Sequence, residues 1–365
     1  MKQFESITEL KRFLTVPYVE EIAVQSLRLT EIEPLMLNIR FSRCLFLGCS
    51  MSDDLLHHLL PGNFIFPLLD VPFNTYPSRL YDTDSLYAGF NRHKPETYLK
   101  TPDKVVYDYY RESRKNLSIK DTLAQRLHDH SITDSLHEYI ASFDERKLVA
   151  IMGGHGILRT EHIYRQVVLL SKSLTEQGYL MLSGGGPGAM EATHLGAWMA
   201  GRGDNECLRA VGILSAVPRY SDEGWLSSAF EVMERFPDPP FDSLGIPTWH
   251  YGHELPTPFA TKLAKYFENS IREEGLLAIA KGGVVFTPGS AGTLQEVFQD
   301  LAQNHYKSYG YASPMIFLDK HFWTTERPVY PVIGEMAERG DLHHLNLGLY
   351  DNNEEVIAHL KKFSE

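Results

Sequence analysis

In the second half of the chain, short apolar runs alternate with longer segments whose apolar residues recur at helical spacing. The stripe of Ile163, Val167, Leu170 and Leu174 predicts a helix over Thr160–Gln177. By the same pattern, strands are predicted at Lys147–Met152, Tyr179–Leu182, Ala210–Leu214, Val284–Thr287, Met315–Asp319 and Leu347–Tyr350. Further helices are predicted at Pro187–Met199, Phe259–Ala280, Gly292–Asn304 and Asn353–Phe363, and a Pro- and aromatic-rich lid or loop at Ser215–Pro258.

The repeated order of strand and helix predicts an α/β fold with a doubly wound, Rossmann-like parallel sheet. We assign residues 146–365 to this sheet and residues 1–145 to an additional N-terminal α/β and helical region. In such sheets, ligands bind beyond the carboxyl ends of the strands. The glycine clusters in residues 146–365 all follow predicted strands, so we expect a ligand site at that edge of the sheet.

The first 145 residues show a weaker pattern. Strands are predicted at Cys44–Gly48 and Phe64–Leu69, and a helix at Asp53–Leu60. We expect Asp103–Phe143 to be largely helical, with breaks near Asn116–Lys120 and Ser131–Asp134. We find no internal repeat, and no motif in this region indicates a particular chemistry.

The chain's 365 residues are enough for two domains, and 43% hydrophobic with 22% charged residues is typical of a globular protein. A net charge of −12 argues against broad nucleic-acid binding, which needs a basic surface. With three cysteines, a disulfide framework is not expected, and Cys44 and Cys49 are predicted to be buried apolar residues in the reducing cytoplasm. No membrane-spanning run or apolar signal core is found, so no membrane association is expected.

A cluster of histidines in the N-terminal region raises the question of a metal site. His128-Asp129-His130 is followed by His137, but Ser131 and Asp134 are typical helix-cap residues. A solvated helix junction is therefore the preferred interpretation, and no metal site is predicted.

Three consecutive glycines follow a predicted strand in the segment Ser183–Glu191 (SGGGPGAME). Glycine allows backbone amides to approach a ligand closely, because no Cβ blocks them. Pro187 suits the first position of a helix, whose N-terminus adds free amides and the positive end of the helix dipole. The segment therefore predicts a phosphate site, with a tight turn that holds no ligand as the alternative.

A second glycine-rich turn, Pro288–Glu296 (PGSAGTLQE), also follows a strand and opens a helix. Thr293 or Ser290 is placed to cap that helix or to donate to a phosphate oxygen. Glu296 falls in the predicted first turn of the helix. At that position, a role as a capping-box acid and a role as an acid that faces a ligand are equally compatible with the sequence.

Two smaller features belong to the same predicted sheet edge. Gly153-Gly154-His155-Gly156 follows the first strand, and we expect His155 to contact a ligand rather than only to form a turn. Arg272 lies on the helix that precedes the strand ending at Pro288. Spacing alone favours a solvated surface arginine at this position.

The motif G-G-G-x-x-G-x-M followed by P-G-G-x-G-T-x-x-E resembles the LOG (Lonely Guy) family of phosphoribohydrolases. The variant G-P-G-A-M-E and the extra N-terminal region are more similar to the larger bacterial purine/pyrimidine nucleotide 5′-monophosphate nucleosidases. The resemblance covers Lys147 to Phe363, and Ser290 replaces the second glycine of the second motif. The residues that match are Gly184, Gly185, Gly186, Gly188, Ala189 and Met190, then Pro288, Gly289, Gly292, Thr293 and Glu296.

The resemblance implies a nucleosidase that hydrolyses the N-glycosidic bond of a nucleoside 5′-monophosphate to free base and ribose 5-phosphate, without a cofactor or metal. It implies Glu296 as the catalytic glutamate and Arg272, after a one-residue shift in spacing, as the catalytic arginine. The residues expected to bind substrate and phosphate are the two glycine turns together with Gly153, Gly154, His155, Ser183 and Ala291.

The resemblance also implies a homodimer or larger homo-oligomer. The alternative function is a non-catalytic nucleotide sensor on the same fold. Single-stranded DNA binding is disfavoured by the acidic charge. Amino-acid decarboxylation is rejected because no feature of the sequence indicates a lysine that forms a Schiff base with pyridoxal phosphate.

Overall fold

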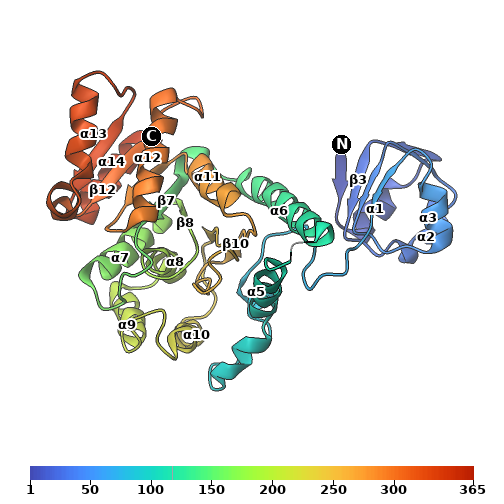
Figure 1. The fold of residues 1–365 in the computed structure, drawn as a ribbon, viewed down its shortest axis with the longest axis horizontal. Coiled ribbons are helices and arrows are strands. Elements are labelled where there is room, and N and C mark those ends of the chain that lie inside the picture. The colour runs from blue at the N-terminus through green and yellow to red at the C-terminus, as the bar shows by residue number, and fades with distance from the viewer. Residues whose placement is uncertain (117) are drawn as a thin grey trace. The chain divides into compact units, whose positions relative to one another are not determined.

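The computed structural model describes residues 1–116 and 118–365, which divide into two compact units (Figure 1). The first unit comprises Met1–Leu80 and Asp108–His137, and the second comprises Tyr81–Tyr107 and Glu138–Glu365. The units thus alternate along the chain, whereas the sequence analysis placed a single boundary near residue 145. None of the described helices combines the length and the hydropathy needed to cross a membrane.

The first unit is built from parallel strands joined by short helices. Its strands form a four-stranded sheet in the order β1-β3-β5-β6 and a two-stranded sheet of β2 and β4. The elements are β1 (Lys2–Phe4), α1 (Ile7–Phe13), β2 (Tyr18–Glu20), β3 (Ile22–Gln25), the 3-10 helix η1 (Leu29–Glu31), α2 (Glu33–Met36), β4 (Arg40–Ser42), β5 (Leu45–Leu47), α3 (Asp53–Leu59) and β6 (Phe64–Phe66). Helices α5 (Pro102–Ser113) and α6 (Ile119–Ile140) contribute residues to both units.

The first unit contains a repeat of backbone conformation. Glu21 separates strands β2 and β3, and Ser26 follows β3. Both of these residues have a left-handed φ of about 55°. Strands β4 and β5 repeat this arrangement with Arg43 and Gly48 at the corresponding left-handed positions. Because the residue types at these positions differ, the repeat lies in the backbone conformation and cannot be found by sequence identity.

Other expectations for the N-terminal region are confirmed in part. The two predicted strands and the helix are present as β5, β6 and α3, and the three cysteines are buried. Helix α6 runs without a break through Ser131–Asp134, so the predicted helix junction there was wrong. His128 and Asp129 are buried and hydrogen-bonded to each other rather than solvated. Leu117, inside the predicted break at Asn116–Lys120, lies outside the described residues.

The second unit contains a seven-stranded, fully parallel sheet in the order β10-β9-β8-β7-β11-β12-β13. The strand order reverses at β7 (Leu148–Met152), which lies between β8 (Leu180–Ser183) and β11 (Gly283–Phe286). This topology confirms the doubly wound, Rossmann-like sheet. The remaining strands are β9 (Ser243–Gly245), β10 (Lys262–Leu263), β12 (Pro314–Leu318) and β13 (Asn346–Tyr350).

The helices of the second unit connect these strands and cover the sheet. All five residues of β7 are buried, as expected of a central strand in a parallel sheet. Its alternate residues Val149 and Ile151 join the core formed with α7, α8 and α14. The helices are α4 (Thr83–Leu86), η2 (Pro95–Lys100), η3 (Glu145–Lys147), α7 (His162–Glu176), α8 (Ala189–Met199), α9 (Asp204–Leu214), α10 (Trp225–Arg235), α11 (Asn269–Ile279), α12 (Ala291–Tyr306), the π-helix η4 (Phe322–Glu326), α13 (Val329–Glu338) and α14 (Asn353–Ser364).

Three predictions in the middle of this unit were wrong. Ala210–Leu214 is the second half of α9, whose buried residues follow helical spacing and whose Glu206 carboxylate caps the Gly203 amide. Ser215–Pro258 is not only a lid or loop, because it contains α10 and the sheet strand β9. Within Phe259–Ala280, the first part contributes β10 and only α11 is helical. The strands β9 and β10 are too short to show a period in the sequence.

Candidate functional site

A pocket of about 390 Å³ opens where β7 and β11 end, at the point where the strand order of the sheet reverses. Such reversal points are the usual ligand sites of doubly wound sheets. The pocket brings together both predicted catalytic residues and residues from all three glycine-rich segments, although Met190 alone represents Ser183–Glu191. It is lined by Gly153, Gly154, His155, Met190, Tyr251, Glu254, Arg272, Glu273, Ser290, Ala291, Gly292, Thr293, Gln295 and Glu296.

The N-terminus of α12 opens into this pocket. Ser290 is the N-cap residue, but its side chain makes no capping hydrogen bond. Ser290, Ala291 and Gly292 are exposed, and a Cβ added at Gly292 would meet no atom within 4 Å. The first amides of an α-helix have no partner within the helix, and the first backbone bond of α12 is from Leu294 N to Ser290 O. The amides of Ala291, Gly292 and Thr293 are therefore available to an anion in the pocket.

Glu296 lies one and a half turns into α12, not in its first turn as predicted, because the helix begins at Ala291. A capping-box role is therefore excluded, since that role belongs to the third helical residue, Thr293. Neither oxygen of the Glu296 carboxylate has a hydrogen-bond partner among the described residues. Burial raises the pKa of Glu296 to about 7; the nearby Arg272 charge opposes this rise and the Glu273 carboxylate adds to it.

Arg272, on α11, is held by backbone carbonyl groups. Its Nε donates to Ile246 O at 2.8 Å, and its Nη2 lies 3.5 Å from Gly184 O. No carboxylate oxygen of the described residues lies within 4.0 Å of the guanidinium, so its charge is not neutralised by an ion pair. A Cβ on Gly184 would overlap with Nη2. Gly184 therefore leaves the space that the guanidinium occupies, and the interpretation of Arg272 as a solvated surface residue does not hold.

Three amides of the first glycine turn donate to groups within the protein. Gly185 N donates to Ser183 Oγ at 3.0 Å, and Gly186 N donates to Met190 Sδ at 3.4 Å. Ala189 N donates to Gly154 O at 3.2 Å. Of the residues in this motif, only Met190 is among those that line the pocket. The turn thus contacts Arg272 and Met190, and its glycines do not themselves line the pocket.

Ser183 and Gly188 also have structural partners. The Ser183 hydroxyl lies 2.8 Å from His194 Nε2, and His194 is fully buried, which lowers its pKa to about 3. The neutral His194 ring also contacts Ser243 Oγ at 2.9 Å and so links β8, α8 and β9. Gly188 has a φ of 68°, and a Cβ there would overlap with Gly154 O. The contacts of Ser183, His194 and Gly188 hold the first glycine turn in place.

The turn after β7 is joined directly to the turn after β11. Gly154 N donates to Pro288 O at 2.9 Å, and a Cβ on Gly153 would overlap with the Thr287 hydroxyl. A Cβ on Gly289 would overlap with Thr293 Oγ1. These close approaches explain why both turns need glycine, and they bring the two strand ends together under one pocket.

Four lining residues were missed by the sequence analysis: Tyr251, Glu254, Glu273 and Gln295. Glu254 Oε1 lies 3.6 Å from His155 Nδ1, on the same wall of the pocket. Glu273 accepts from Asn269 at 2.6 Å and from Gln295 at 2.9 Å, which holds its carboxylate beside Glu296. No sequence motif marks Tyr251 or Glu254, since they come from the segment that the analysis treated as a lid.

The segment that carries Tyr251 and Glu254 is held by residues 81–107 of the same unit. Thr83 Oγ1 donates to Pro258 O at 2.6 Å, and Tyr87 OH donates to Pro256 O at 2.5 Å. Asp103 binds the fully buried Lys265 ammonium and accepts from Trp249 Nε1 at 3.1 Å. These contacts fix both ends of the loop that forms one wall of the pocket.

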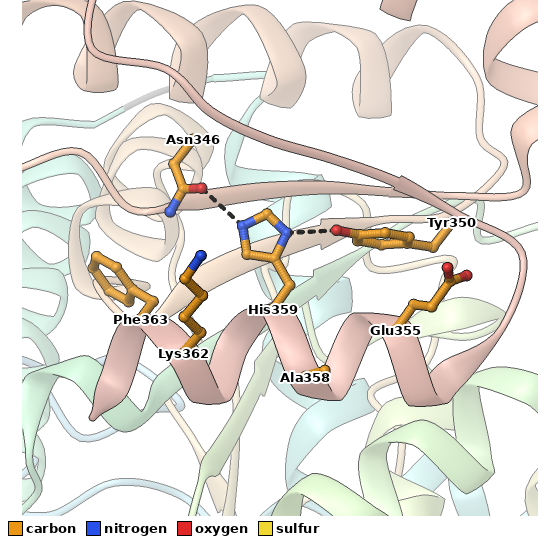
Figure 2. Close-up of a pocket in the computed structure, with 7 residues that line it drawn as sticks. All are labelled: Asn346, Tyr350, Glu355, Ala358, His359, Lys362 and Phe363. Atoms are coloured by element: carbon orange, nitrogen blue, oxygen red, sulfur yellow. Dashed lines mark hydrogen bonds between the residues drawn. The ribbon is translucent and has the colours of Figure 1, made fainter.

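A larger pocket, of about 600 Å³, lies between β13 and α14 (Figure 2). His359 stands at its centre, with Nδ1 3.0 Å from Tyr350 OH and Nε2 2.7 Å from Asn346 Oδ1. Both ring nitrogens are thus occupied. The pocket is on the edge strand of the sheet, its lining includes no glycine, and the amide of Glu355 at the start of α14 is capped by Asn352, so the pocket at β7 and β11 is the candidate site.

No family model matches the chain, and no curated protein is significantly similar to it. Among solved structures, the molybdenum cofactor binding protein from the phototrophic bacterium Rippkaea orientalis has a TM-score of 0.38 at 15% identity and covers 60% of this chain and 97% of its own. The structural-genomics protein TM1055 has a TM-score of 0.36 at 18% identity, with 59% and 98% covered. The molybdenum cofactor carrier protein MCP from Chlamydomonas reinhardtii has a TM-score of 0.36 at 15% identity, with 59% and 97% covered.

Proposed function

We propose that this chain is a nucleoside 5′-monophosphate nucleosidase, which hydrolyses the N-glycosidic bond to give free base and ribose 5-phosphate. One observation carries the proposal: Arg272, Glu296 and the free N-terminus of α12 share the wall of a single pocket. The order of the two glycine motifs, which resembles the LOG family, supports the same reaction.

The 5′-phosphate is proposed to bind at the N-terminus of α12. The amides of Ala291, Gly292 and Thr293 supply hydrogen bonds to its oxygens, and the helix dipole favours its negative charge. The Ser290 hydroxyl, which makes no cap bond, is an additional donor at the same place. The phosphate then fixes the ribose at the sheet edge, and its binding energy is used to orient the sugar.

Arg272 is proposed to hold the ribose hydroxyls or the phosphate. Its Nε and one Nη are directed to backbone carbonyl groups, which fixes the plane of the guanidinium. The remaining N–H groups therefore need no rearrangement before they bind, which suits bidentate contact with the substrate.

Glu296 is proposed to act on the glycosidic bond. As that bond breaks, positive charge develops at C1′ and the ring oxygen, and a carboxylate beside the ribose stabilises it. The same carboxylate can accept a proton from the water that attacks C1′, while the base leaves with the bonding electrons. A pKa of about 7 is well matched to proton transfer near neutral pH.

The test is a screen of purine and pyrimidine nucleoside monophosphates, with the corresponding nucleosides as controls, for release of free base. We expect release from monophosphates and a strong preference for them over nucleosides, because the helix amides contact only the phosphate. Binding of monophosphates without any base release would indicate the nucleotide sensor instead. Equal turnover of nucleosides would contradict the phosphate site at α12.

A further inference from the structure

A second hollow of about 390 Å³ adjoins the candidate site at His155. His155 lines both pockets, and the loop after β7 continues from one into the other through Ile157 and Leu158. Its other wall is formed by Arg219 and Tyr220. We propose that this hollow is the base subsite and that it selects a 6-oxopurine, such as guanine or hypoxanthine. This proposal rests on the proposed function.

The shape and surface of the hollow suit a planar base. Its volume lies within the range of small-molecule sites, about 300–1,000 Å³. Tyr220 is half-buried, and its ring lies 5.8 Å from the His155 ring at an interplanar angle of 82°. Aromatic side chains stack on nucleobases, and Ile157 and Leu158 add apolar surface. Because His155 lines both pockets, the hollow adjoins the pocket that holds Glu296.

The polar groups of the hollow favour a 6-oxopurine. The Arg219 guanidinium makes no hydrogen bond or ion pair with the described residues, and it can only donate. Guanine and hypoxanthine present two adjacent acceptors, O6 and N7, whereas adenine presents N7 beside an amino donor. On the wall formed by the loop after β7, Glu161 Oε1 accepts from Leu158 N at 2.8 Å. Glu161 Oε2 has no partner among the described residues and can accept from the N1–H that adenine lacks.

The first test is Tyr220→Ala, with Tyr306→Ala as the matched control on the exposed end of α12. The kcat/KM for GMP is measured together with the inhibition constant of ribose 5-phosphate. Loss of stacking is expected to lower kcat/KM about fivefold or more, while inhibition by ribose 5-phosphate changes less than about twofold. An unchanged kcat/KM, or an equal loss for ribose 5-phosphate, would overturn the subsite.

The second test concerns the choice of base. Wild type is expected to favour GMP and IMP over AMP, and Arg219→Met to reduce that preference about fivefold or more. Arg209→Met, an exposed arginine on α9, is expected to leave it unchanged. Equal use of AMP by wild type would overturn the 6-oxopurine assignment.

If wild type releases no base from any monophosphate, the proposed function fails on its own. The subsite is then judged from the dissociation constants of GMP, AMP and ribose 5-phosphate, for which the same variants are expected to have the same selective effects. Loss of GMP affinity in Tyr220→Ala without loss of ribose 5-phosphate affinity would sustain the subsite, and no difference would overturn it.

Discussion

At the scale of single residues, the candidate site depends on a half-buried carboxylate, that of Glu296, which lines the pocket and has no hydrogen-bond partner among the described residues. Burial raises the pKa of Glu296 from 4.5 to about 7, although Arg272 opposes the change. A carboxylate with a pKa this high can accept a proton near neutral pH. The same environment makes the activity of the proposed enzyme dependent on pH in a defined direction.

The pH dependence of base release follows from the charged form of Glu296. The carboxylate is required, so kcat/KM should rise about tenfold per pH unit below about 7 and level off above it. Initial rates measured between about pH 5 and about pH 9 in wild type and Glu296→Gln check this expectation. The variant should lose the rise as well as most of the rate. A wild-type profile that is flat across pH 7 would contradict the assignment.

Asp300 lies one turn beyond Glu296 on α12 and affects stability rather than the pocket. It is buried, its Oδ2 has no partner among the described residues, and burial raises its pKa from 3.8 to about 8. Because the folded state binds this proton more tightly than the unfolded state, stability is lost as pH rises from about 4 to about 8. Asp300→Asn should remove this loss and stabilise the protein at pH 8 by on the order of 3–6 kcal/mol.

The measurement for Asp300 is the free energy of unfolding in urea at about pH 5 and about pH 8. The exposed Asp341→Asn serves as the control, since it should leave the difference between the two pH values unchanged. Equal pH slopes for wild type and Asp300→Asn would show that the carboxyl group is not held protonated.

At the scale of elements, the two glycine motifs have different roles, although the sequence predicted phosphate binding for both. The amides of the first turn bind Ser183, Met190 and the loop after β7, whereas those of α12 remain free. Gly184 instead leaves space for Arg272. The first glycine turn therefore acts on the substrate through the position of the arginine.

Gly184→Ala tests this division. The added Cβ overlaps with Arg272 Nη2, so the guanidinium must shift, and a shift of about 1 Å can cost about 100-fold in rate. We expect kcat/KM for base release to fall by about that factor. The control is Gly212→Ala on α9, where a Cβ meets no atom within 4 Å. If the two variants keep equal activity, Gly184 has no role in placing the arginine.

Much of this arrangement was predictable from the sequence because glycine motifs at strand ends have few structural uses. The alternation of apolar runs predicted most of the sheet. Spacing alone favoured a surface position for Arg272, and only the family resemblance implied that it shares a site with Glu296. The short strands β9 and β10 carry no period, so the wall that contributes Tyr251 and Glu254 was not predicted. Which amides are free depends on contacts such as Ala189 N to Gly154 O, which only the folded chain reveals.

At the scale of the whole molecule, the second unit includes residues 81–107, which lie in the sequence between the two segments of the first unit. Residues 81–107 pack against the pocket wall, and Asp103 forms an ion pair with the buried Lys265. Burial lowers the pKa of Lys265, and the Asp103 charge opposes that change. Removing the carboxylate leaves a buried ammonium without its partner.

Asp103→Ala should therefore lower the free energy of unfolding by about 3–5 kcal/mol, as measured in urea. The double variant Asp103→Leu/Lys265→Met should recover most of this loss, because apolar residues of similar size remove both charges together. Equal stability of Asp103→Ala and wild type would mean that this ion pair does not support the second unit.

The most direct test of the central claim is single-turnover base release by Glu296→Gln, compared with wild type and with Glu274→Gln. Glu274 is an exposed residue of α11 and provides a matched control. If Glu296 stabilises the developing charge, its variant should bind nucleoside monophosphates with nearly unchanged affinity but release base about 100- to 10,000-fold more slowly. Glu274→Gln should match wild type. An unchanged rate of base release in Glu296→Gln would contradict the account.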